Sequence, residues 1–97
     1  MRMKGTRRTL ADGTVALSLE GEFTIYTAKK LGELLMKEMG NGGRVELDLE
    51  GVSRFDSAGY QLLEHTRREA MKRGGALTVA GRSSEVESLY ALYGTCR

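Results

Sequence analysis

The chain has 97 residues, a length that suits one domain built around one hydrophobic core. Apolar residues make up 40% of it and charged residues 29%, which is typical of a water-soluble globular protein. The net charge of +2 is too small to predict binding to nucleic acid or to an anionic membrane surface. No stretch approaches the roughly eighteen consecutive apolar residues of a membrane-spanning helix, so we expect no membrane insertion.

The N-terminus and the single cysteine both favour the cytoplasm. The basic segment at residues 1–5 is not followed by an apolar stretch, so we do not expect a secretory signal. Cys96 has no second cysteine with which to form an intramolecular disulfide. We therefore expect a cytoplasmic protein with a reduced thiol of no functional importance.

The first part of the chain predicts a β-hairpin followed by a helix. Asp12-Gly13 lies between two extended segments and is a strong hairpin signal. Apolar and polar residues alternate over 15–20, which predicts a strand with one buried face that ends at Gly21. Thr27 is placed to cap a helix over residues 28–39, because the apolar positions of this segment recur at helical spacing.

The second part predicts strands and helices in alternation. Glycines within residues 40–43 end the first helix, and a loop over 51–56 leads into the second. The segment from Ser84 to Glu87 matches a capping box at the start of a third helix, which Gly94 ends. The elements expected before that capping box are a strand, a helix and a short strand, over residues 45–50, 58–73 and 76–80. The apolar stripe of the third helix consists of Val86, Leu89, Tyr90, Leu92 and Tyr93.

This order of elements predicts an α/β fold with a small mixed β-sheet. The hairpin is antiparallel, and the strand–helix–strand units that follow give parallel strands. Alternation in the two strands over 15–20 and 45–50 indicates that the helices lie mainly on one face of the sheet. We expect a single domain over residues 1–97, with its other sheet face and its sheet edges open.

Residue patterns for catalysis, metal binding and cofactor binding are absent. His65 is the only histidine, and a lone histidine in a charged helix favours a solvated side chain over a ligand. Glu46, Asp48 and Glu50 share one face of a strand, which favours a solvated sheet surface. No phosphate-binding glycine motif is present. We therefore expect a protein that is not an enzyme and that has no metal and no cofactor.

The second helix carries several basic residues that favour an exposed helix face. Glu64 and Arg68, like Glu69 and Arg73, have the i,i+4 spacing of stabilising ion pairs. A surface for nucleic acid would need unpaired basic residues and stacking aromatic ones, yet aromatic residues make up 6% of the chain. We expect no nucleic-acid binding.

The start of the second helix has features that helix capping alone does not explain. Either Asp56 or Ser57 is suited to be the N-cap. Gly59 costs roughly 1 kcal/mol relative to alanine in a helix, and it would open the backbone to close approach by another molecule. Tyr60 is either a core residue or an interface residue. A phosphate on Ser57 would be favoured by the helix N-terminus and opposed by Asp56, which describes a binding switch.

The sequence resembles a STAS domain, the fold of bacterial anti-sigma factor antagonists. The matching segments are the strand VELDLEGVSRF, the D-[ST]-x-G motif in DSAGYQLL, and GGALTVAGRSSEVESLYALYG. The resemblance implies that a partner serine kinase, itself an anti-sigma factor, phosphorylates Ser57. It also implies that the unphosphorylated form binds this kinase and releases the sigma factor, so that the chain regulates transcription. The partner-binding residues would be Asp56, Ser57, Ala58, Gly59 and Tyr60.

The resemblance leaves other partners open. Ala58 stands where many antagonists have a second serine or threonine, and Tyr60 where they usually have leucine. The D-[ST]-A-G variant is also similar to the STAS subunit of phospholipid-transport ABC complexes, which binds and stabilises the ATPase subunit. The segment EFTIYTAKKL is similar to STAS proteins of chemotaxis systems. A sensor of small ligands or nucleotides is a further alternative, and the sequence leaves the oligomeric state open.

Overall fold

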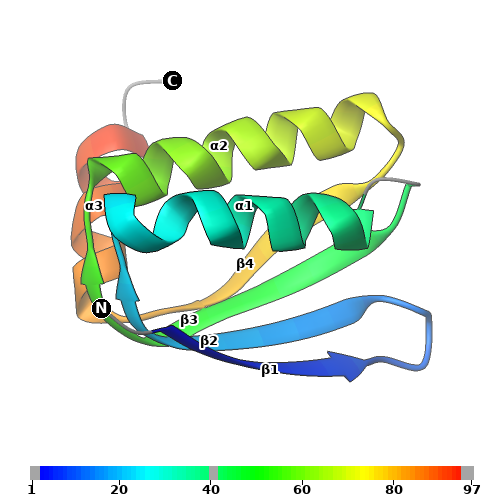
Figure 1. Ribbon diagram of the computed structural model, residues 1–97, viewed down its shortest axis with the longest axis horizontal. Coiled ribbons are helices and arrows are strands. Elements are labelled where there is room, and N and C mark those ends of the chain that lie inside the picture. The colour runs from blue at the N-terminus through cyan, green and yellow to red at the C-terminus, as the bar shows by residue number, and fades with distance from the viewer. Residues whose placement is uncertain (1–2, 40–41, 95–97) are drawn as a thin grey trace.

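The computed structural model describes residues 3–39 and 42–94 (Figure 1). Cys96 and part of the predicted glycine stop at 40–43 therefore lie outside the described residues. The described elements, in chain order, are β1 (Met3–Thr9), β2 (Val15–Phe23), α1 (Ile25–Met39), β3 (Arg44–Phe55), α2 (Ser57–Lys72), β4 (Ala76–Arg82) and α3 (Ser84–Gly94).

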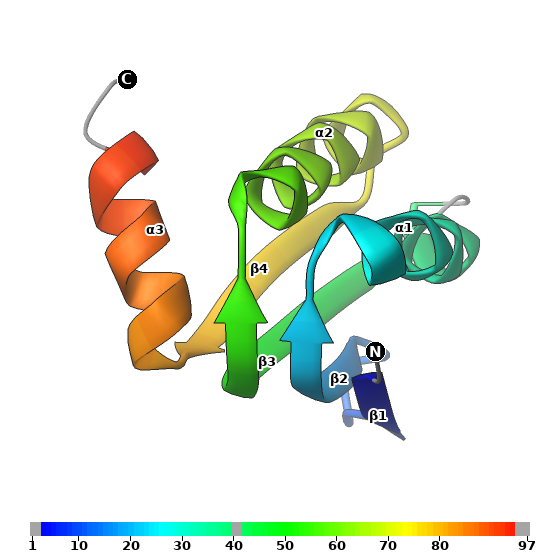
Figure 2. The ribbon, with the colours of Figure 1, turned by 60° about the vertical axis from the view of Figure 1, so that its left-hand side comes forward.

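The four strands form one sheet in the order β1-β2-β3-β4. The pair β1-β2 is antiparallel, whereas β2-β3 and β3-β4 are parallel. Figure 2 shows α1 and α2 side by side over one face of the sheet, with α3 standing beside its β3–β4 side. The predicted mixed sheet with helices mainly on one face is confirmed. None of the described helices is long and apolar enough to cross a membrane.

The predicted hairpin and the buried face of β2 are confirmed. Gly13 has a φ of 91°, a conformation that glycine adopts without strain, and Asp12 Oδ1 accepts a hydrogen bond from the Thr14 N–H at 3.0 Å. The alternating apolar residues of β2 that lie against the helices are Val15, Leu17 and Leu19, and all three are buried. The alternation thus decides which face of β2 joins the core, and the hairpin fixes its register with β1.

The hydrophobic core lies between the sheet and the helices. Each fully buried aliphatic or aromatic side chain contributes about 1.5–3 kcal/mol of hydrophobic stabilisation. The largest of these side chains are Phe23, Leu35, Met39, Leu47, Leu49 and Leu63. On the opposite sheet face Glu46 and Glu50 are exposed and Asp48 is half-buried, so the predicted polar sheet surface is confirmed.

Two strands are longer than their sequence patterns predict. β2 continues through Gly21, which has a φ of 109° beside a shift in the register with β3, and ends at Phe23. β3 continues to Phe55, which pairs with Phe23, so most of the expected loop is strand. The local pattern could not predict this, because the hydrogen bonds that extend each strand come from its neighbour in the sheet.

The helix α1 begins three residues before the predicted start at Ala28. Thr24 precedes the helix, and its carbonyl oxygen accepts a hydrogen bond from the Ala28 N–H at 2.9 Å. Thr27 is therefore not the N-cap, but its Oγ1 accepts a hydrogen bond from the Thr24 N–H at 3.1 Å. The same hydroxyl donates to the Glu22 carbonyl oxygen at 2.9 Å. Thr27 thus stabilises the helix start from within the first turn.

The helix α3 is capped one residue earlier than the predicted capping box. Ser83 Oγ accepts a hydrogen bond from the Val86 N–H at 3.3 Å, and the Ser83 carbonyl oxygen accepts one from the Glu87 N–H at 2.8 Å. Ser84 is therefore the first helical residue. Glu87 Oε1 instead accepts a hydrogen bond from Arg82 Nη1 at 3.1 Å, which ties the end of β4 to α3.

The apolar stripe of α3 is only partly buried. Val86 is fully buried, and Leu89 and Tyr90 are partly buried, as the helical spacing predicts. Leu92 is 62% exposed and Tyr93 is 37% exposed, so the outer part of this stripe lies outside the core. Figure 2 shows α3 standing to one side of α1 and α2 instead of lying over the sheet between them.

Candidate functional site

The connection between β3 and α2 is a single residue, Asp56, which is the N-cap of α2. Its backbone is extended, and its Oδ1 accepts a hydrogen bond from the Gly59 N–H at 3.1 Å. Its carbonyl oxygen accepts a second hydrogen bond, from the Tyr60 N–H, also at 3.1 Å. Of the two N-cap candidates, Asp56 is the cap and Ser57 is the first helical residue.

The side chain of Ser57 is exposed at this helix start. Within the described part of the chain, the Ser57 hydroxyl makes no hydrogen bond, because Asp56 supplies the capping oxygen. A helix N-terminus carries partial positive charge from its unpaired N–H groups and therefore favours an anion. The position thus combines an accessible hydroxyl with a local field that favours a phosphate on it.

Gly59 is buried against the chain's own aromatic residues. A Cβ at this position would lie 3.0 Å from the Phe23 carbonyl oxygen, and 3.1 Å from both Phe23 Cδ1 and Phe55 Cε1. The expectation that this glycine opens the backbone to another molecule is therefore corrected. The close approach is made by the ends of β2 and β3, and the glycine allows α2 to start directly above them.

Tyr60 is half-buried, so its burial is intermediate between that of a core residue and that of an exposed interface residue, the two roles that the sequence left open. Its ring centroid lies 5.0 Å from that of Tyr90 in an edge-to-face contact and 4.9 Å from that of Tyr93 in a stacked one. The Phe55 ring stacks on Tyr90 with centroids 6.2 Å apart and meets the Phe23 ring edge-on at 5.3 Å. These five aromatic residues join the site at the start of α2 to α3.

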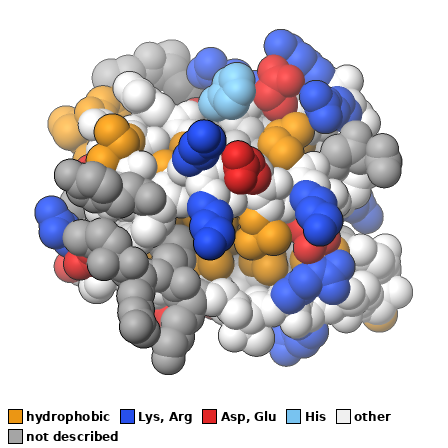
Figure 3. Space-filling model, viewed as in Figure 1, with side chains coloured by type: hydrophobic (Ala, Val, Ile, Leu, Met, Phe, Trp, Pro, Cys, Tyr) orange, Lys and Arg blue, Asp and Glu red, His pale blue; other side chains and the backbone are white. Residues whose placement is uncertain are grey.

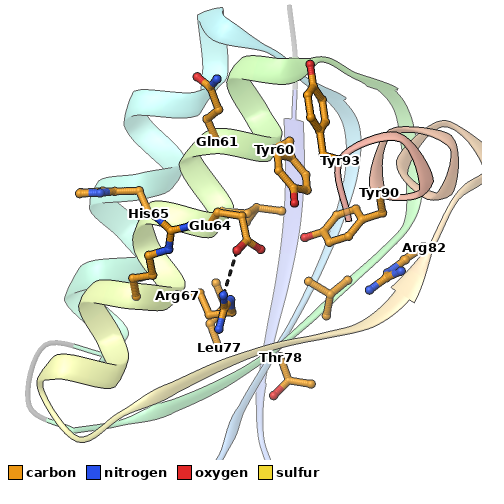
Figure 4. Close-up of a pocket in the computed structure, with 13 residues that line it drawn as sticks. Tyr60, Gln61, Glu64, His65, Arg67, Leu77, Thr78, Arg82, Tyr90 and Tyr93 are labelled. Carbon is orange, nitrogen blue, oxygen red and sulfur yellow. Dashed lines mark hydrogen bonds and ion pairs between the residues drawn. The ribbon is translucent and has the colours of Figure 1, made fainter. Parts of the chain in front are cut away.

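A groove of about 770 Å³ opens between α2, β4 and α3 (Figure 4). Tyr60 and Tyr90 direct their rings toward one another at one end, whereas His65 points away from the space (Figure 4). Arg67 Nη2 donates to Glu64 Oε1 at 2.9 Å, and the Arg82 guanidinium lies 4.1 Å from the centroid of the Tyr90 ring. Sequence analysis missed this groove, because it depends on how three consecutive elements pack against one another, which local residue patterns do not show.

The environment of Tyr90 disfavours its phenolate. Burial of the side chain raises the pKa of Tyr90 to about 12, and the negative charge of Glu64 acts in the same direction. The positive charge of Arg82 opposes this increase but does not cancel it. Tyr90 therefore keeps its proton, and with it a hydrogen-bond donor at the groove, well above neutral pH.

The charged residues of α2 pair differently from the i,i+4 prediction. Glu64 pairs with Arg67 at 2.9 Å, and Glu69 pairs with Lys72 at 3.3 Å, so both pairs have i,i+3 spacing. The predicted partners Arg68 and Arg73 are both exposed. On the face shown in Figure 3, acidic and basic side chains are interspersed. The predicted exposed face of the helix is confirmed, whereas the predicted pairing is wrong.

Comparison with known proteins matches the chain to one protein family. A family model described as "Mlab, STAS domain" matches residues 6–96. An anti-sigma factor antagonist from Mycobacterium paratuberculosis has a similar structure, with a TM-score of 0.82 and 22% identity over 97% of this chain and 80% of that one. The unphosphorylated anti-sigma factor antagonist SpoIIAA matches with a TM-score of 0.77 and 19% identity, over 94% of this chain and 81% of that one.

The phosphorylated form of the Bacillus cell fate determinant SpoIIAA has a similar structure as well. Its TM-score is 0.73 at 18% identity, over 94% of this chain and 84% of that one. At such low identity, these likenesses concern the fold alone. No curated protein sequence matches the chain.

Proposed function

The chain belongs to the STAS domain family, and on this premise we propose that it is a non-enzymatic regulatory module whose binding to a protein partner is switched by phosphorylation of Ser57. The observation that carries the proposal is the exposed Ser57 hydroxyl beside Asp56, whose carboxylate already caps α2. The partner is a serine kinase of the anti-sigma factor type. The similar structures include SpoIIAA in unphosphorylated and in phosphorylated form, which supports a switch by phosphorylation.

The fold tolerates a phosphate at Ser57. The phosphate adds about −1.5 to −2 charges at neutral pH, and the N-terminus of α2 stabilises them. The hydrogen bond from the Gly59 N–H to Asp56 persists, because the Ser57 hydroxyl takes no part in it. Phosphorylation therefore changes the charge of the binding surface and leaves the underlying helix in place.

The binding surface extends from Ser57 to the start of α1. The parallel pairing of Phe23 with Phe55 brings the first residues of α1 and α2 to the same end of the sheet (Figure 2). Ile25, at the start of α1, is 64% exposed and provides an apolar contact for a partner. Ala58 and Tyr60 are half-buried at the rim, whereas the buried Gly59 shapes the surface from beneath.

A second candidate function is constitutive binding to an ABC transporter ATPase without phosphorylation. Two observations favour it: Ala58 in the Asp-Ser-Ala-Gly motif, and the description of the matching family model as Mlab. This function uses the same surface around Ser57, with the serine hydroxyl as a hydrogen-bonding group instead of a phosphate acceptor.

The proposal is tested by purifying the chain with its partner from the native cell and mapping phosphate by mass spectrometry. Ser57→Ala is compared with Ser84→Ala, since Ser84 is likewise an exposed first residue of a helix. We expect a serine kinase to copurify, phosphate on Ser57, and no phosphate in the Ser57→Ala variant. The Ser84→Ala variant retains the phosphate, and Ser57→Asp no longer binds the kinase.

Two results would count against the phosphorylation switch. One is an ATPase that copurifies with an unmodified chain, which would favour the second candidate. The other is equal partner binding by the wild type, Ser57→Ala and Ser57→Asp, which would show that the partner does not contact the start of α2.

A further inference from the structure

A second surface lies along β4, the last strand in the order of the described sheet. On its outer side β4 has no strand partner within residues 3–39 and 42–94, so alternate backbone N–H and C=O groups face outward. The groove described above runs beside this edge, since three consecutive residues of β4, Leu77, Thr78 and Val79, line it (Figure 4). An edge with a groove beside it is suited to an extended polypeptide.

The lining of the groove is more basic than acidic. Among the residues that the structure describes, Arg67, Arg68 and Arg82 line it, together with a single acidic residue, Glu64. Arg68 is exposed and makes no ion pair among the described residues. The pairs Glu64–Arg67 and Arg82–Glu87 are partly exposed, so they contribute little and can yield to carboxylates of a partner.

Charge also decides between the possible occupants of this edge. Two copies joined along β4 would bring their Arg68 and Arg82 residues toward one another, which is unfavourable. An acidic strand would instead direct every second side chain toward the arginines, while its backbone pairs with β4. Half-buried Tyr90, held by Arg82 above its ring, provides a rigid wall for such a segment.

We propose that an extended, acidic segment of a partner protein binds along β4 as an additional strand, with its carboxylates on Arg68 and Arg82. This surface goes beyond the switch at Ser57, and Tyr60 is the one proposed partner-binding residue that also lines the groove. The chain would thus hold a partner at two places, one that phosphorylation changes and one that it leaves unchanged.

The test measures binding of a short fluorescent peptide of alternating glutamate and valine to the full chain. An N-methylated version of the peptide keeps the carboxylates but has no backbone N–H groups, and a lysine–valine peptide reverses the charge. We expect only the unmodified glutamate peptide to bind and to slow amide hydrogen exchange in β4. Arg68→Glu should weaken it at least about tenfold, the effect of replacing one charge-assisted contact by repulsion.

Arg73→Glu is the matched control, since Arg73 is also an exposed arginine, at the C-cap of the same helix, but does not line the groove. It should leave the affinity unchanged, and so should Ser57→Asp, which separates this surface from the phosphorylation switch. The proposal is wrong if the glutamate peptide does not bind, or if N-methylation or Arg68→Glu leaves binding unchanged. Self-association of the chain through β4, detected by light scattering and not displaced by the peptide, would also overturn it.

Discussion

Asp56 Oδ1 accepts a hydrogen bond from the backbone N–H of Gly59 at 3.1 Å. This bond closes the first turn of α2, and Ser57 lies between the two residues that it joins. Because the carboxylate satisfies the N–H group, the serine hydroxyl is left for other uses. The same turn contains Gly59, which is buried against Phe23 and Phe55. One short segment therefore has an outer side that is accessible and an inner side that is closely packed.

Replacement of Asp56 tests the cap. Asp56→Ala should lower the free energy of unfolding by about 1 kcal/mol, because the Gly59 N–H loses its acceptor. Asp56→Asn keeps an oxygen acceptor and should stay close to the wild type, and Ser57→Ala should do the same. Urea unfolding followed by circular dichroism measures all three. Equal losses in Asp56→Ala and Ser57→Ala would contradict the assignment of Asp56 as the cap.

Gly59→Ala tests the packing beneath the site. The new methyl group would lie 3.0–3.1 Å from the backbone and ring atoms of Phe23 and from the Phe55 ring, so we expect a net loss of about 1–3 kcal/mol from overpacking. Gly32→Ala in α1 is the control, because its methyl group meets the flexible end of Leu62 at 2.8 Å. Thermal unfolding should show a smaller effect at Gly32, where the helix also gains propensity. If Gly59→Ala were the more stable variant, the close packing would be in doubt.

The raised pKa of Tyr90 predicts a dependence of stability on alkaline pH. Below pH 10.0, the ordinary tyrosine value, both the folded and the unfolded chain hold the proton. As pH rises from there to the folded pKa of about 12, the unfolded chain releases the proton first, so stability falls.

Tyr90→Phe removes this contribution, so its stability should fall less steeply than that of the wild type over the same range. Denaturant unfolding at several pH values measures the slopes, and the titration of phenolate absorbance in the variant should lose a step near pH 12. If the free energy of unfolding fell equally steeply with pH in the two proteins, burial would not hold the proton on Tyr90.

Two apolar residues of α3 differ sharply in burial and should differ in their effect on stability. Val86 is fully buried, so Val86→Ala leaves a cavity and should cost about 1–3 kcal/mol. Leu92 is 62% exposed, and Leu92→Ala should change stability by less than about 0.5 kcal/mol. Chemical unfolding of the two variants gives both values. A larger loss at Leu92 would mean that the outer end of α3 is covered in solution.

Patterns within a few residues predict well the elements whose partners are also local. The alternation in β2, the Asp12-Gly13 turn and the order of strands and helices all agree with the structure. The capping residues show where this reasoning weakens. Ser83 and Ser84 are both suitable caps, as are Thr24 and Thr27, and sequence alone placed the start of each helix at the later residue.

The sequence by itself determined the type and order of the elements and the motif at Asp56-Ser57, because hydrophobic periodicity and capping act between residues close in the chain. Only the tertiary structure decided the length of β3, the burial of Gly59 and the groove beside β4. These depend on atoms distant in sequence: Phe23 lies beneath Gly59, and Tyr90 lies beside Tyr60. A residue pattern shows which face of an element is apolar, but only the packed fold fixes what that face contacts.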